Sequence, residues 1–221
     1  YVMGERGARN EPATPEDIAQ MAAIVKEGIE AGGMGFSTSR TLAHRAMDGE
    51  PVPGTYAAED ELFGIGRALG EVGRGVFELA PAAIDGLDAA DPFKEIDWMR
   101  RLGAEIQRPV SFALLQLDPA PELWRQLMDL SLEAIDGGAN LRPQVASRPF
   151  GLLTGLQTNH VFAKRPTFLG LAHLPLDELV VALKDPATKA AILSEADAAP
   201  DPNVLFDGIG VFLGMMIDKT F

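Results

Sequence analysis

The sequence repeats one pattern four times: an amphipathic helix, a short connection that usually contains glycine, and a short apolar strand. The first copy begins at Thr14-Pro15, because threonine is a preferred helix N-cap and proline fits the first helical turn. Apolar residues then recur at helical spacing until Gly32-Gly33, and the next residues, MGFSTS (34–39), are typical of a buried strand. This alternation constrains the fold more than any other feature.

The other three copies follow in order along the chain. Asp91-Pro92 and Asp118-Pro119 predict the N-caps of the third and fourth helices. The three further strands are predicted at GVFELA (75–80), PVSFALLQ (109–116) and NLRPQVA (140–146). Strands that alternate with helices of this length pair in parallel through right-handed crossovers, so the predicted fold class is α/β.

Four units are compatible with two architectures. One is a partial (β/α)8 TIM barrel of about four βα units, and the other is an open, doubly wound sheet that is complete at four or five strands. In the barrel interpretation we expect a single partial barrel domain over residues 1–221. Its four helix-strand units occupy residues 1–145, and a long loop with C-terminal helices occupies residues 146–221.

The connections after the strands are much longer than those before them. Residues 39–57, 81–90 and 146–174 follow the first, second and fourth predicted strands. Parallel strands aim their carboxyl ends at one face, where β/α proteins build their sites from long loops. We therefore predict that the polar loop after the first strand belongs to a functional rim, the alternative being a tolerated surface insertion.

Composition excludes several classes of partner. The formal net charge of −13 and the pI near 4.6 disfavour phosphate backbones and anionic lipids, so we expect no nucleic acid and no membrane. No apolar run approaches the roughly 18 residues of a membrane helix. The absence of cysteine fits a reducing compartment, and we expect a cytoplasmic protein. Because the chain opens on Tyr1 without a leader, we expect it to be processed or cut from a longer protein.

Standard catalytic motifs are missing. The three histidines, His44, His160 and His173, are far apart and form no metal-binding motif. Ser37 lacks the second glycine of a nucleophile elbow, and a triad of Ser37, His44 and Asp48 has no geometric support. The glycine patterns at 64–70 and 208–214 lack the context of a nucleotide-binding loop, so we interpret them as packing contacts.

Polar residues at the ends of the predicted strands remain as site candidates. Glu78 alternates with apolar Phe77 and Leu79, so we expect a carboxylate that faces the barrel interior or a helix pair and needs a partner. A salt bridge to an arginine and a catalytic role are both open for it. The arginines Arg40 and Arg148 either bind a substrate carboxylate through a bidentate fork or neutralise neighbouring acids.

Residues 1–62, together with RPVSFALLQ, LRPQVASRPFGLLTGLQ and FLGLAHLPLDELV, resemble the N-acyl-D-amino-acid deacylase (D-aminoacylase) branch of the amidohydrolase superfamily. The most specific parts are Gly-Phe-Ser-Thr-Ser (35–39) and Pro-Gly-Thr-Tyr-Ala (53–57). The resemblance implies a (β/α)8 barrel of the metal-dependent hydrolase type, in which zinc activates water to attack the amide carbonyl of a small N-acyl amide. It also implies an internal fragment that is inactive alone.

At two positions the sequence departs from the pattern of the family that it resembles. Better-known deacylases carry a histidine at the end of the strand that is GVFELA here and another where this chain has PVSFALLQ, and neither is present. No complete metal site is therefore expected in this chain, with Glu78 the only catalytic candidate. The residues expected to bind substrate are Ser37, Thr38, Ser39, Arg40, His44, Gln116, Gln144 and Arg148. Two alternatives stay open: a catalytically degenerate relative that binds small molecules, and an unrelated small α/β domain.

Overall fold

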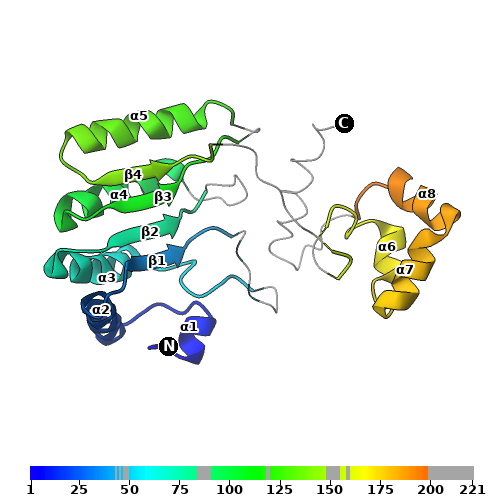
Figure 1. Ribbon diagram of the computed structural model, residues 1–221, viewed down its shortest axis with the longest axis horizontal. Coiled ribbons are helices and arrows are strands. Elements are labelled where there is room, and N and C mark those ends of the chain that lie inside the picture. The colour runs from blue at the N-terminus through cyan, green and yellow to red at the C-terminus, as the bar shows by residue number, and fades with distance from the viewer. Residues whose placement is uncertain are drawn as a thin grey trace. The chain divides into compact units, whose positions relative to one another are not determined.

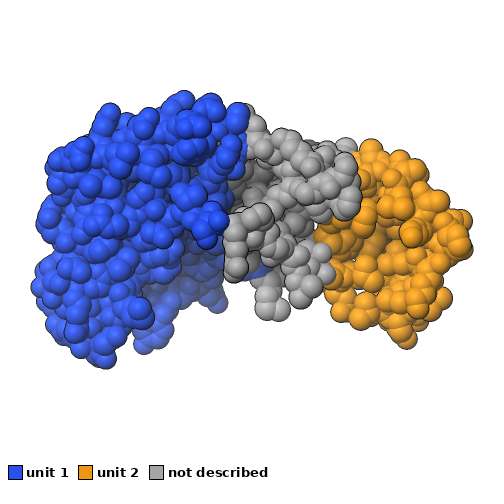
Figure 2. Space-filling model, turned by 45° about the horizontal axis from the view of Figure 1, so that its top comes forward, with its two compact units in different colours: residues 1–148 blue, residues 149–221 orange. Residues whose placement is uncertain are grey.

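The computed structural model describes residues 1–42, 44, 46, 50–83, 91–117, 120–147, 155–157 and 160–198. The chain divides into two compact units, residues 1–148 and residues 149–221 (Figure 2). The first unit contains the sheet and four long helices, and the described part of the second unit is helical. Among the described residues, no helix is long and apolar enough to cross a membrane.

The first unit is built on a four-stranded parallel sheet with the strand order β1-β2-β3-β4. In Figure 1 the four arrows point the same way, from β1 at one edge to β4 at the other. The strands are β1 (Gly35–Ser39), β2 (Val76–Ala80), β3 (Val110–Ala113) and β4 (Leu141–Gln144). A doubly wound sheet reverses its strand order at a switch point, and this sheet does not. The sequential order is the one found in a barrel wall.

Each strand is preceded by a helix: α2 (Pro15–Glu30), α3 (Glu59–Val72), α4 (Pro92–Ile106) or α5 (Leu123–Asp136). The predicted caps of the first and third of these are confirmed. Thr14 and Asp17 form a capping box at the start of α2, and Asp91 accepts a hydrogen bond from the backbone of Phe93 at the start of α4. The short helix α1 (Glu5–Ala8) is joined to α2 by an ion pair between Arg6 and Asp17 at 2.7 Å.

The fourth helix begins later than predicted. Asp118 and Pro119 lie outside the described residues, and α5 begins at Leu123 with Glu122 as its N-cap. Before it, the backbone N–H of Ala120 donates to the carbonyl of Leu117. The other predicted elements are found within a few residues of their expected limits, although β3 is shorter than the apolar run that predicted it.

One face of the sheet carries the core. Alternate strand residues point at the helices, and four of them are at most 1% exposed: Phe77, Leu79, Phe112 and Leu141. Burying side chains of this size contributes about 1.5–3 kcal/mol each, so this face dominates the stability of the unit. Successive strand residues point to opposite faces, and the intervening positions therefore lie on the other side of the sheet.

The glycines of GIGRALG (64–70) are packing contacts, as predicted. They lie within α3, and a Cβ atom on Gly64 would meet the Ile18 side chain of α2 at 2.3 Å. A Cβ atom on Gly66 would meet Leu102 of α4 at 2.7 Å. The glycines allow both neighbouring helices to approach α3 closely. The second glycine pattern, residues 208–214, lies outside the described residues.

The second unit has its own small core. Its described helices are α6 (Pro166–Leu171), α7 (Leu176–Lys184) and α8 (Pro186–Ser194). Phe168, Leu179 and Ile192 supply one buried residue from each helix. Glu195 accepts a hydrogen bond from the backbone N–H of Thr167 at 3.0 Å, which joins the end of α8 to the start of α6. The described part of this unit adds no strand to the sheet.

Candidate functional site

A row of polar side chains crosses the sheet on the face opposite the helices. The strand register pairs Ser37 with Glu78, Glu78 with Ser111, and Ser111 with Arg142. Every member alternates with a residue that points at the helices, so all four side chains lie on the same face. We call these four residues the strand row. It brings two hydroxyls, a carboxylate and a guanidinium together from four strands that are far apart in sequence.

Glu78 is the centre of this row. Ser37 Oγ donates a hydrogen bond of 2.5 Å to Glu78 Oε2, and the glutamate side chain is exposed. Of the two directions left open for Glu78, the structure shows the one opposite the helices, whereas Phe77 and Leu79 point toward them. The salt bridge to an arginine, one of the two roles left open, is not formed with any described residue. The serine hydroxyl takes that place, because it faces Glu78 directly across the β1–β2 pair.

Small side chains lie one step further toward the carboxyl ends of the strands. Ser39 is paired with Ala80, and Ala113 is paired with Gln144. The two alanines lie directly beyond Glu78 and Ser111 on the same face of the sheet. A methyl group covers little of a neighbouring side chain, so these two described residues leave the middle of the strand row uncovered on the side of the rim. Gln144, the last residue of β4, is exposed beside the alanines, and its place at the barrel mouth stays a prediction.

The loop after β1 adds an imidazole to the rim. Ser39 Oγ and His44 Nδ1 are 2.6 Å apart, so these two predicted residues are hydrogen-bonded to each other. Both line an open groove of about 740 Å³ that also includes Ser37, Glu78 and Glu61. Burial raises the pKa of the Glu61 carboxyl above its ordinary value. The remaining lining is largely apolar and includes Met21, Ile24, Val25 and Tyr56.

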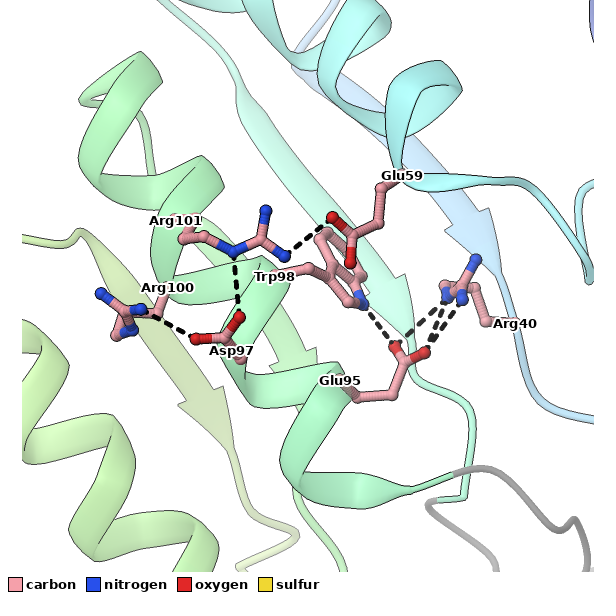
Figure 3. A network of polar contacts seen from close by, with 7 residues as sticks. All are labelled: Arg40, Glu59, Glu95, Asp97, Trp98, Arg100 and Arg101. Atoms are coloured by element: carbon pink, nitrogen blue, oxygen red, sulfur yellow. Dashed lines mark hydrogen bonds and ion pairs between the residues drawn. The ribbon is translucent and has the colours of Figure 1, made fainter.

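Arg40 does not point into the groove. Its guanidinium binds the carboxylate of Glu95 on α4, with Nη2 to Oε1 at 2.9 Å and Nε to both oxygens at 3.1 and 3.2 Å (Figure 3). Trp98 Nε1 donates to the same carboxylate at 2.9 Å, and its ring lies 5.6 Å from the guanidinium. Both charged side chains are largely buried, at 15% and 8% exposed. The structure thus gives Arg40 the neutralising role that was the alternative to substrate binding.

The same guanidinium closes the polar loop. Arg40 Nη1 donates a 2.6 Å hydrogen bond to the carbonyl of Ala57, and the Arg40 backbone N–H donates to Ala80 at 2.8 Å. The Arg40 side chain therefore ties the beginning of the loop to its end, and the Arg40 backbone ties it to β2. Within the loop, Thr55 is 3% exposed and its hydroxyl donates to the carbonyl of Val52 at 2.7 Å.

Sequence reasoning missed Glu95, although it organises this corner of the site. It lies in the first turn of a predicted helix, where an acid is expected for the helix dipole alone. Its spacing of three residues from Trp98 was the available signal, because residues at i and i+3 share a helix face. One turn along, Asp97 binds Arg100 and Arg101 on the exposed side of α4, and these hydrogen bonds lower the pKa of its carboxyl (Figure 3).

Three other predicted residues lie away from the strand row. Thr38 is paired with Leu79 and points to the helix side of the sheet, where its hydroxyl lies beside Gly54. Gln116 is exposed beyond the end of β3. Arg148 lies outside the described residues. Substrate binding by these residues stays a prediction. Arg142, which lies inside the predicted fourth strand, completes the row.

Comparison with known proteins decides the family. The sequence model described as "Amidohydrolase family" matches residues 1–208. The chain belongs to the Amidohydrolase family. The alternative of an unrelated small α/β domain is therefore wrong. No match was found among curated proteins.

Solved structures of this family share the fold. A D-aminoacylase studied for its binuclear metal centre is 19% identical with a TM-score of 0.50, and N-acyl-D-glutamate deacylase from Bordetella bronchiseptica, complexed with zinc and a phosphonate inhibitor, is 20% identical with a TM-score of 0.50. Each match covers 63% of this chain and 27% of the solved chain. The four strand-helix units are thus part of an amidohydrolase (β/α)8 barrel, as predicted, and the chain spans about a quarter of these structures.

The described residues do not by themselves fit a metal centre. No group of three histidine, aspartate or glutamate side chains comes together in the described part of the chain. Ala80 ends β2, and Leu114, just past β3, is 3% exposed, so the ends of both strands carry side chains without donor atoms. Of the histidines, His44 is at the rim and His160 and His173 are in the second unit. The described side chains at the groove that could donate to a metal are His44 and the carboxylates of Glu11, Glu61 and Glu78.

Proposed function

We propose that the protein is a hydrolase that acts on the carbon–nitrogen bond of N-acyl amino acids or similar small amides. In this proposal the described chain supplies the substrate-side wall of the barrel mouth. The observation that carries the proposal is the convergence of Ser37, Glu78, Ser39 and His44 at the carboxyl ends of parallel strands in a chain of the Amidohydrolase family. Active sites of such barrels lie at that end.

The two hydrogen-bonded pairs have different roles in this proposal. Ser37 holds the Glu78 carboxylate in place on the strand row, where its second oxygen is available to accept a hydrogen bond from an amide N–H. Ser39 orients the His44 ring through Nδ1, which directs the other ring nitrogen away from the strand. The apolar part of the groove suits an acyl chain. The partner is thus a small N-acyl amide rather than a macromolecule.

Metal chemistry in this protein requires donors from outside the described residues. The neighbouring D-aminoacylase has a binuclear metal centre and the neighbouring deacylase binds zinc, which supports zinc as the cofactor of the intact protein. The absence of donors at the ends of β2 and β3 favours a second candidate, a relative that binds small amides without hydrolysing them. We therefore assign no catalytic step to a metal held by these strands.

Metal content and turnover of the intact protein distinguish the two candidates. We expect about one to two zinc ions per chain by elemental analysis, and hydrolysis of N-acetyl-D-amino acids that a chelator abolishes. Amide binding without zinc and without turnover would establish the binding relative instead. Neither binding nor turnover with any N-acyl amino acid would refute both.

Substitution of His44 tests whether the rim loop takes part in the reaction. We expect His44→Ala to lower kcat/KM by about tenfold or more, because a positioned polar group at the site is lost, while the unfolding midpoint stays unchanged. His173→Ala, which removes a histidine of the second unit, is the matched control. Wild-type kcat/KM in the His44 variant would show that the rim loop has no part in the reaction.

A further inference from the structure

We infer that Glu78, Ser111 and Arg142 form a subsite for the amino-acid part of the ligand, with the α-carboxylate on Arg142 and the adjacent N–H on Glu78. This inference rests on the proposed function and adds a specificity: the ligand must carry a carboxylate beside a hydrogen-bond donor. The subsite lies on β2, β3 and β4, next to the groove formed by β1 and its loop. The groove and the subsite therefore receive different ends of one small molecule.

The first argument is that two opposite charges share one face of the sheet without neutralising each other. Among the described residues, neither Glu78 nor Arg142 has a salt-bridge partner. Glu78 accepts only from Ser37, and Arg142 Nη1 donates only to the carbonyl of Leu141, at 2.8 Å. Both side chains are exposed. A guanidinium has five N–H donors, so most of those on Arg142 are available to a ligand.

The second argument is the spacing. Glu78 and Arg142 are in register with Ser111 from both sides, so they lie two strands apart. Two strand spacings of about 4.8 Å separate their Cα atoms by about 10 Å, and both side chains extend from the same face. The two charged groups form no ion pair with each other, and Cα atoms about 10 Å apart can hold a molecule of amino-acid size between their side chains. Ser111 lies between them, and its hydroxyl has no bond to a described residue.

The third argument is access. Ala80 and Ala113 follow Glu78 and Ser111 on the open face, toward the carboxyl ends of the strands. Of the described residues on this route from the rim, the two alanines present only methyl groups, where larger side chains would cover the row. The polar side chains Ser39 and Gln144 flank the two alanines on β1 and β4.

Charge selects the class of ligand. Arginine binds carboxylates and phosphates through paired N–H bonds. A phosphate at Arg142 would carry more negative charge into a site that already contains Glu78, in a chain with a net charge of −13. A carboxylate adds one charge, and the neighbouring N–H of an N-acyl amino acid complements Glu78. The row therefore favours an N-acyl amino acid over a phosphorylated metabolite.

The test compares two probes that differ only in this carboxylate. Binding of N-acetyl-D-leucine and of N-acetyl-D-leucinamide to the intact protein is measured by isothermal titration calorimetry. We expect the carboxylate to bind at least about tenfold more tightly than the amide, since a hydrogen bond to a charged group is at stake. Arg142→Gln is expected to remove this preference. Glu78→Gln is expected to weaken both probes severalfold and to keep the preference.

Two exposed residues that bind elsewhere serve as matched controls. Arg100→Gln and Glu71→Gln remove the same charges from outer ion pairs on α4 and α3, and both variants should keep wild-type affinities. Ala113→Leu tests the access route, because a larger side chain beside the row should weaken both probes with little change in thermal stability. Equal affinities of the unaltered protein for the two probes, or a carboxylate preference that survives in Arg142→Gln, would overturn the subsite.

The outcomes separate this inference from the proposed function. Carboxylate-selective binding that depends on Arg142, without any hydrolysis, supports the subsite and refutes the hydrolase. Normal hydrolysis with a carboxylate preference that is independent of Arg142 supports the hydrolase and refutes the subsite.

Discussion

The two faces of the sheet use the same four strands for opposite purposes. On the helix side, Phe77, Leu79 and Phe112 are at most 1% exposed and belong to one continuous core. On the other side, the same strands carry the strand row, in which Glu78 is exposed. Because the side-chain period of a strand is two, one short segment can hold a core residue and a site residue next to each other. Stability and ligand chemistry are therefore separable by single substitutions.

The largest expected effect is on the core face. Phe77→Ala should lower the free energy of unfolding by about 3–5 kcal/mol, because the neighbouring core side chains cannot fill the cavity that it leaves. Chemical denaturation of the intact protein measures this change. Ser37→Ala, directly across from Glu78 on the open face, is the control and should cost less than about 1.5 kcal/mol. Similar losses for both variants would contradict the division between the faces.

The buried ion pair between Arg40, at the start of the loop after β1, and Glu95 of α4 gives the next largest effect. Glu95→Ala should lower the free energy of unfolding by about 3 kcal/mol, because it leaves the largely buried Arg40 guanidinium without its carboxylate. Glu105→Ala removes a carboxylate from an exposed pair with Arg67 and should cost less than about 1 kcal/mol. Thermal denaturation distinguishes the two. A change no larger in Glu95→Ala than in Glu105→Ala would show that the pair does not hold the loop.

The smallest effect belongs to the solvent side of α4, and it depends on pH. Arg100 and Arg101 lower the pKa of Asp97, so the carboxylate stabilises the fold above its unfolded pKa near 3.8. This contribution is lost as the pH falls through the lower folded pKa. Asp97→Asn should therefore lose less than about 1 kcal/mol of stability at pH 7, and this loss should shrink as the pH falls below 3.8. Asp129→Asn, on an exposed face of α5, should show no such difference when unfolding is followed across this range.

The sequence was sufficient for the order of elements and for the alternation of side chains along each strand. Thr14-Pro15 and Asp91-Pro92 predicted helix starts because capping is a local interaction between residues a few positions apart. The alternation around Glu78 predicted that its side chain lies opposite those of Phe77 and Leu79, but it left open which of the two faces the helices cover. The sequential strand order that separates a barrel wall from a doubly wound sheet came only from the structure, since periodicity carries no information about which strands are neighbours.

The roles of individual charges were harder to predict. Arg40 and Arg142 are both arginines at strand ends, yet the first is buried against Glu95 and the second is exposed on the strand row. The partner of Arg40 is 55 residues away in sequence, so no local pattern could assign it. Likewise, the pairing of Ser39 with His44 depends on the path of a loop rather than on the spacing of letters.

The bond from Arg40 to Ala57 has a consequence for how this rim can diverge. It fastens both ends of the loop to the barrel wall, so changes in its length or composition need not disturb the strands. The entropy of closing such a loop grows only slowly with its length. Natural variation and grafting experiments can therefore replace the segment between Arg40 and Ala57, which includes His44, while the sheet and its helices keep their structure.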